Sequence, residues 1–256
     1  MVEFRAEDGT LGEGLMGHIC GAGHFGEVSW QRHVKAHEDR VKVSSLKAQC
    51  ESLIADCKRL HPQMKRLTDA VELVDRARAS LQSKGSDLFR ICLEATRRND
   101  GLVQVQDWSG RTLAIRLRHR AFWTRPDHST SMKLANLLRN LRDFQMRVEQ
   151  ADSANRLSGL ISAIGSPSQQ AREILSEIEN DIRALHEENL FEIIPLVNEI
   201  TERKRLRVKK GVIEYTADYW PTAGSRWDTL LVTDTFPLLL QTVERMKAAT
   251  AIRTAA

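Results

Sequence analysis

Apolar residues recur along residues 43–81 at alternating steps of three and four, the spacing of a heptad repeat. This spacing keeps one narrow stripe of side chains facing a partner helix. The stripe consists of Val43, Leu46, Cys50, Leu53, Cys57, Leu60, Met64, Leu67, Val71, Val74, Arg78 and Leu81. Every position except Arg78 is apolar. The pattern predicts long helices that pack as a bundle or a coiled coil.

A proline interrupts this helical pattern on the side opposite the stripe. Pro62 removes a backbone donor, so we expect it to kink the helix or to split it into an antiparallel pair near 60–63. Gly85 is expected to end the run as a C-terminal cap. Further on, Thr130 or Ser131 is predicted to cap another long helix.

The clearest strand pattern lies in the middle of the chain. Residues 102–106 and 111–118 alternate apolar and polar side chains on either side of the turn-like sequence 107–110. This arrangement predicts a β-hairpin. The expected fold class is therefore mainly α, with long heptad-patterned helices and a small β element. A second strand region is expected over 208–215, interrupted by Gly211.

Helix-start signals mark the beginning of a third segment. Ser166 is expected to cap a helix, with Pro167 in its first turn and Gln169 as the reciprocal capping residue. That helix is expected to bend at Pro195. We predict three segments: a flexible glycine- and histidine-rich segment over 1–30, a helical region with the hairpin over 31–165, and a C-terminal helical region over 166–256.

The composition favours a soluble helical protein. Hydrophobic residues make up 41% and charged residues 28% of the chain, and no run approaches the roughly 18–20 apolar residues that span a bilayer. Residues 1–8 are too charged for the core of a signal peptide. Cys50 and Cys57 fall in the apolar stripe, where free cysteine acts as a small hydrophobe. We expect a cytoplasmic protein without a membrane partner.

The sequence Gly21-Ala22-Gly23-His24-Phe25-Gly26-Glu27-Val28 resembles the glycine-rich loop of protein kinases, which covers nucleotide phosphates. The rest of the chain has no H-R-D-x-x-x-x-N catalytic loop and no D-F-G motif. We therefore interpret these residues as a flexible glycine loop and expect no kinase activity. No other set of nucleophile, base and orienting group is evident, so the chain is more consistent with a non-enzymatic protein.

Histidines cluster in the same part of the chain. A set of four potential ligands has the number of donors that a zinc site needs. These residues are Cys20, His24, His33 and His37. No cofactor is otherwise expected, and solvated histidines are the alternative interpretation.

Positive charge is concentrated in two segments. Between residues 97 and 142 there are ten Arg or Lys against three acidic residues, and the run 203–210 adds more. Such segments can track phosphates, and aromatic residues beside them can stack on bases. The candidate residues are Arg116, Arg118, Arg120, Trp123, Arg125, Arg203, Lys204, Arg205, Arg207, Lys209 and Lys210.

Three functional hypotheses follow from these patterns. The first is a helical assembly or adaptor protein that associates with itself or a partner through the heptad stripe. Its expected interface residues are Val43, Leu46, Leu53, Leu60, Leu67, Val71, Val74 and Leu81. The second is a nucleic-acid-binding component that uses the basic segments 111–125 and 203–210. The third is a small metal-binding protein that uses the Cys/His cluster within 20–37.

Overall fold

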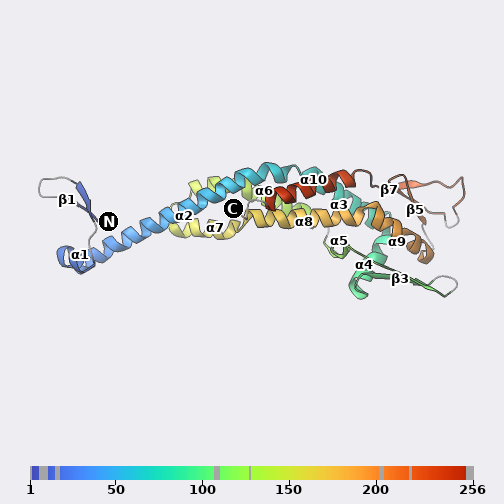
Figure 1. Ribbon diagram of the computed structural model, residues 1–256, viewed down its shortest axis with the longest axis horizontal. Coiled ribbons are helices and arrows are strands. Elements are labelled where there is room, and N and C mark those ends of the chain that lie inside the picture. The colour runs from blue at the N-terminus through green and yellow to red at the C-terminus, as the bar shows by residue number, and fades with distance from the viewer. Residues whose placement is uncertain are drawn as a thin grey trace. The chain divides into compact units, whose positions relative to one another are not determined.

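The computed structural model describes residues 2–5, 11–14, 18–106, 110–126, 128–201, 205–218 and 221–251. It is mainly helical with small antiparallel sheets, which confirms the predicted fold class (Figure 1). The chain forms two compact units. One comprises residues 1–58 and 142–165, and the other comprises residues 59–141 and 166–256.

The first unit begins with an antiparallel pair of strands, β1 (Val2–Arg5) and β2 (Leu11–Gly14). Helix α1 (His18–Phe25) follows, then the long helix α2 (Glu27–Lys65). The end of α6 (Ser129–Glu149) and helix α7 (Ala154–Ile164) complete it. Buried Cys50, Cys57, Phe144, Leu157 and Ile164 contribute to its core.

Regular structure within residues 1–30 differs from the flexible lead-in that the glycines predict. The kinase-like glycine motif is a helix and a turn, and two of its glycines are required for different reasons. A side chain at Gly21 would overlap the indole ring of Trp30, and Gly26 joins α1 to α2 with a φ of +77°. Only glycine adopts that φ without strain. Gly21 therefore lets α1 approach Trp30 of α2, and Gly26 makes the turn between the two helices.

The heptad stripe lies on the inner side of α2 and of α3 (Thr68–Ser83). From Cys50 onward every stripe position is buried except Leu53, which is half-buried like Val43 and Leu46. Pro62 sits inside α2, and the helix breaks a few residues later. There the amides of Arg66 and Leu67 donate to the carbonyls three residues back, in a tighter turn. Pro62 therefore precedes a short break between successive helices.

The second unit is organised around α8 (Pro167–Leu185). Helix α10 (Phe236–Ala251) runs along it, and α3, α5 (Arg120–Thr124) and α9 (Glu187–Ile200) also pack against it (Figure 1). The predicted start of α8 is confirmed, since the Ser166 hydroxyl accepts from the Gln169 amide at 3.3 Å. The Gln169 side chain instead donates to Glu173. The break comes at His186, while Pro195 is accommodated within α9.

The predicted hairpin is confirmed and follows α4 (Ser86–Arg98). Strands β3 (Leu102–Gln106) and β4 (Thr112–Arg116) pair antiparallel, with Val103 opposite Ile115. The second strand region is itself a hairpin, β5 (Arg205–Lys209) and β6 (Val212–Thr216), to which β7 (Asp228–Val232) adds a third strand. Lys210 and Gly211, with φ of +48° and +73°, make its two-residue turn.

Candidate functional site

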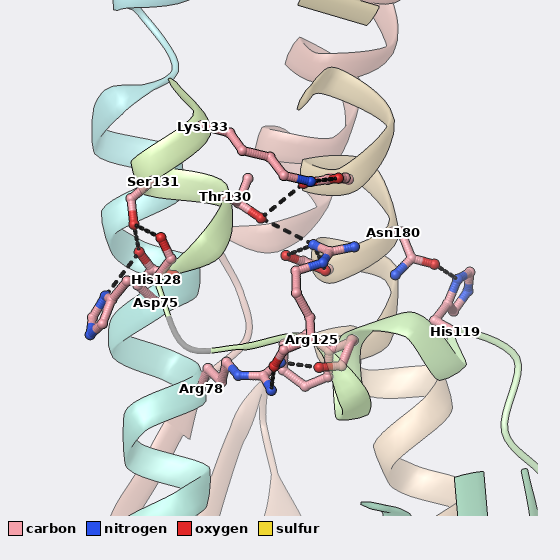
Figure 2. Close-up of polar contacts among 12 residues, drawn as sticks. Asp75, Arg78, His119, Arg125, His128, Thr130, Ser131, Lys133 and Asn180 are labelled. Atoms are coloured by element: carbon pink, nitrogen blue, oxygen red, sulfur yellow. Dashed lines mark hydrogen bonds and ion pairs between the residues drawn. The ribbon is translucent and has the colours of Figure 1, made fainter. Parts of the chain in front are cut away.

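A cluster of charged side chains is buried where α3, α5, α6 and α8 meet in the second unit (Figure 2). Its first member is Arg78, the polar exception in the heptad stripe, which is 7% exposed. The Arg78 guanidinium donates to the backbone carbonyls of Phe122 and Arg125, at the end of α5. It also lies 4.9 Å from the centroid of the Phe122 ring and 5.2 Å from that of Phe89. Arg78 thus fastens α5 to α3 through hydrogen bonds and cation–π contacts.

The side chain of the second member, Arg125, extends from the end of α5 towards α8 and away from Arg78. Its Nη1 lies 2.7 and 2.6 Å from the two carboxylate oxygens of Asp181 on α8. The same nitrogen is 3.1 Å from the hydroxyl of Thr130 on α6, which in turn reaches Glu177 at 3.4 Å. Lys133 pairs with Glu177 at the solvent side of the cluster. The network therefore joins four helices through polar contacts.

Burial dominates the electrostatics of this cluster. It raises the pKa of Asp181 from 3.8 to about 6, although Arg125 and Arg78 favour the charged carboxylate. Two residues earlier, Glu179 is also desolvated, but hydrogen bonds and charges from Lys247 and Arg183 lower its pKa below the usual range. Asp181, at 5% exposed, and Thr130, at 4%, have little contact with water. The cluster is thus suited to holding helices together, and its titrating group is Asp181.

Two smaller polar groups flank the cluster in Figure 2. The His119 Nδ1 lies 3.1 Å from the Asn180 Oδ1, and burial lowers the pKa of His119, so the ring is neutral at pH 7. On the other side, Asp75 on α3 accepts from the Ser131 hydroxyl, and the His128 Nδ1 lies 3.3 Å away. These groups join the start of α6 to α3 and the start of α5 to α8.

The structure separates the basic residues predicted for nucleic-acid contact. Arg116, Arg118 and Arg120 are exposed at the hairpin, where Arg116 and Arg120 pair with Asp100. Trp123 is only 2% exposed and packs edge-on against Phe122, and the Arg125 side chain is enclosed with Asp181. Neither is part of the exposed basic surface, because the side chains of Trp123 on α5 and of Arg125 just after it turn into the core.

The basic run 203–210 lies largely on one strand. Arg203 and Lys204 fall outside the described residues. Arg207 pairs with Glu214 at 2.6 Å and lies 3.9 Å from the centroid of the Trp227 ring, and Arg205 donates to the Asn198 carbonyl. Lys209 and Lys210 are exposed at the turn. Internal acceptors therefore engage the two described arginines of the run.

The candidate zinc ligands are spread over two helices. Cys20 is exposed on α1, and His33 and His37 are exposed on α2. The side chain of His24 lies outside the described residues. Within the part of the chain that the structure describes, no three His, Cys, Asp or Glu side chains come together as a metal-binding group.

The predicted interface residues differ in burial along the stripe: the later ones are buried and the earlier ones are half-buried. Leu60, Leu67, Val71, Val74 and Leu81 are core residues of the chain. Val43, Leu46 and Leu53 are half-buried near the exposed part of α2. Between residues 31 and 49 no side chain is buried, and Val41 is 54% exposed. Residues 31–49 are therefore the longest part of α2 without a buried side chain.

In the sequence, Arg78 stands out only as an exception in the apolar stripe, Thr130 is predicted only as a helix cap, and no pattern points to a role for Asp181. The available signals were a single arginine in an apolar stripe and an aspartate beside Ile182 in the apolar pattern of α8.

None of the described helices is long and apolar enough to cross a membrane. Comparison with protein-family models, with characterised proteins and with solved structures finds no match to this chain.

Proposed function

We propose that this chain is a non-enzymatic helical assembly or adaptor protein, and that the exposed part of α2, residues 31–49, binds another helix. The observation that carries the proposal is the exposure of this segment. Val34, Val43 and Leu46 are half-buried, and every other side chain of the segment is exposed. Helices in proteins gain most of their stability from packing of one face. This segment has little such packing within the described chain.

The composition of the segment supports the same proposal. It contains Val34, Val41 and Val43, whose branched side chains lose rotamer freedom in a helix, and the adjacent serines Ser44 and Ser45. A second helix packed along Val34 and Val41, which lie two turns apart on one side of α2, would supply the missing stabilisation.

Hydrogen exchange on the dilute full-length chain tests the first half of this proposal. Amides of residues 36–47 are expected to exchange much faster than those of α8, since little packing resists local unfolding there. Protection equal to that of α8 at the lowest usable concentration would show that the segment needs no partner, and would contradict the proposal.

Site-specific photocrosslinking in cells tests the second half. A photoreactive residue at position 41 is expected to give one discrete adduct, with a second copy or with another protein. The matched control is position 238, since Leu238 on α10 is 69% exposed and lies away from the segment in sequence. Val34→Asp should abolish the adduct by placing a charge in the same face. An adduct at 41 no stronger than that at 238 would refute binding at this helix.

A further inference from the structure

The two β structures of the second unit differ in how their outer edges are closed. In the sheet of β5, β6 and β7, the Asn198 carboxamide donates to the Leu206 carbonyl at 2.7 Å and accepts from the Leu206 amide at 2.9 Å. At the opposite edge, the Ser80 hydroxyl donates to the Leu230 carbonyl at 2.7 Å. Free strand edges recruit further strands, and side-chain caps of this kind prevent that.

The hairpin of β3 and β4 has an edge without such caps. The Leu117 amide donates to the Gly101 carbonyl at 2.8 Å. In an antiparallel pair every second residue of a strand bonds to the neighbouring strand, so the backbone groups of Leu113 and Ile115 also face β3. The backbone groups of Thr112, Ala114 and Arg116 therefore point away from β3. Among the described residues, no hydrogen bond from outside the hairpin reaches these groups, and Ala114 is exposed.

Positive charge surrounds this open edge. Arg111, Arg116 and Arg118 lie along β4 and its flanks, all exposed. Asp100 offsets part of this charge by pairing with Arg116 and Arg120, and Glu192 lies 4.0 Å from Arg118. Among the described residues at β4 and its flanks, the four arginines Arg111, Arg116, Arg118 and Arg120 outnumber the two acids Asp100 and Glu192, which favours an acidic ligand.

We propose that the outer edge of β4 is a docking site for an extended, acidic segment of another protein. The segment adds a strand to the hairpin through the backbone of Thr112, Ala114 and Arg116. Its carboxylates pair with the surrounding arginines. Backbone hydrogen bonds supply affinity in this mode, and the side chains on alternate positions supply selectivity. This site is distinct from the helix-binding segment of α2 and does not depend on it.

The backbone chemistry of the edge favours a peptide over a nucleic acid. The edge presents alternating N–H donors and carbonyl acceptors at the spacing of a strand, whereas phosphodiester groups only accept. Both aromatic residues that the structure describes just after the hairpin, Phe122 and Trp123, are buried and offer no face for a base. A second copy of the same edge is disfavoured, because it would bring two sets of arginines together.

Fluorescence anisotropy with labelled synthetic peptides and the full-length chain tests this site. The probe alternates Glu with Val. One control has Lys in place of Glu, and a second keeps Glu but is N-methylated at alternate residues, so that it lacks the donors of a ladder. A single-stranded oligothymidine is the third probe. We expect the acidic peptide to bind, the N-methylated peptide to bind at least about tenfold more weakly for loss of one or two hydrogen bonds, and the Lys peptide not to bind.

The protein variants Ala114→Pro and Ala114→Thr form a matched pair. Proline removes only the outward amide of β4 and leaves the hairpin's own ladder intact, as edge strands tolerate. It should weaken binding of the acidic peptide at least about tenfold, whereas threonine should not. Equal binding of the N-methylated peptide would overturn strand addition, even if Ala114→Pro failed to fold. Tighter binding of the oligothymidine than of the acidic peptide would assign the arginines to nucleic acid instead.

Discussion

The guanidinium of Arg78 donates to the backbone carbonyl of Arg125, the residue whose own guanidinium holds both carboxylate oxygens of Asp181. Arg78 thus hydrogen-bonds to the main chain at the end of α5. The side chain of Arg125 extends from that main chain and pairs with Asp181 on α8. Because both positive groups are enclosed, removal of either leaves polar groups buried without partners.

Replacement of Arg78 should be among the most destabilising changes in the second unit. Arg78→Met keeps the aliphatic stem but leaves the Phe122 and Arg125 carbonyls without their donor. We expect the free energy of unfolding to fall by about 3 kcal/mol or more, measured by urea denaturation. Arg76→Met on the exposed side of the same helix is the control and should change stability by less than about 0.5 kcal/mol. A loss below about 1 kcal/mol for Arg78→Met would show that Arg78 does not hold α5 in place.

Asp181 should make stability depend on pH in an unusual direction. Its pKa is raised from 3.8 to about 6 in the folded state, so the folded chain holds this proton more tightly than the unfolded chain. The resulting stability is fully present below pH 3.8 and is lost as pH rises through about 6. At about 1.4 kcal/mol for each pKa unit, this contribution to the free energy of unfolding is roughly 3 kcal/mol.

Two isosteric variants should show opposite pH dependence. Asp181→Asn should gain stability relative to the wild-type chain between pH 4 and pH 7, because Asn does not titrate and still accepts from Arg125. Glu179 has a lowered pKa, so Glu179→Gln should lose stability at neutral pH and lose less in acid. Urea denaturation across this pH range measures both. Parallel profiles for Asp181→Asn and the wild-type chain would contradict the assignment.

Gly211 is required both for its backbone angle and for the space it leaves. A side chain there would be strained at a φ of +73° and would overlap the Asp234 carboxylate. Gly211→Ala should cost about 2 kcal/mol or more. Gly110 has a similar φ of +79°, and a side chain there would meet none of the described atoms within 4 Å. Gly110→Ala should therefore cost only the backbone strain, about 1 kcal/mol. Asp234→Ala should restore part of the loss in Gly211→Ala, as thermal denaturation of the double variant would show.

The packing of α1 on α2 should depend on one glycine and not on its neighbour. Gly21→Ala would displace the Trp30 indole, whereas an alanine side chain at Gly23 meets none of the described atoms within 4 Å. We expect hydrogen exchange in α1 to accelerate in Gly21→Ala. Gly23→Ala should slow it, since alanine stabilises a helix by about 0.5–1 kcal/mol over glycine. Equal exchange in both variants would show that α1 does not depend on contact with Trp30.

The helical part of the fold was predictable because its determinants are local. The stripe over 43–81 and the Ser166 cap follow from residue spacing, and the structure has both. The polar cluster was not predictable, because Arg78, Arg125 and Asp181 are far apart in the chain. Only the packing of α3, α5 and α8 brings them together. An arginine in an apolar stripe signals a buried partner without identifying it.

The basic segments show a different limit of sequence reasoning. Alternation along residues 111–118 correctly indicates a strand, but the charge of a face depends on what lies opposite it. Arg116 meets Asp100, Arg207 meets Glu214, and Arg125 turns inward to Asp181. A count of arginines along the chain therefore overestimates the positive surface that a ligand meets.

The caps on the two edges of the β5–β6–β7 sheet also constrain the order of folding. Asn198 lies eight residues from Leu206, whereas Ser80 lies 150 residues from Leu230. The first cap closes a short loop and can form as soon as α9 and β5 exist. The second must wait until distant segments meet, since long-range closure is the slower step. Of these two capped edges, the β7 edge is therefore the later one to be shielded, and it stays open to pairing with other strands until α3 packs against β7.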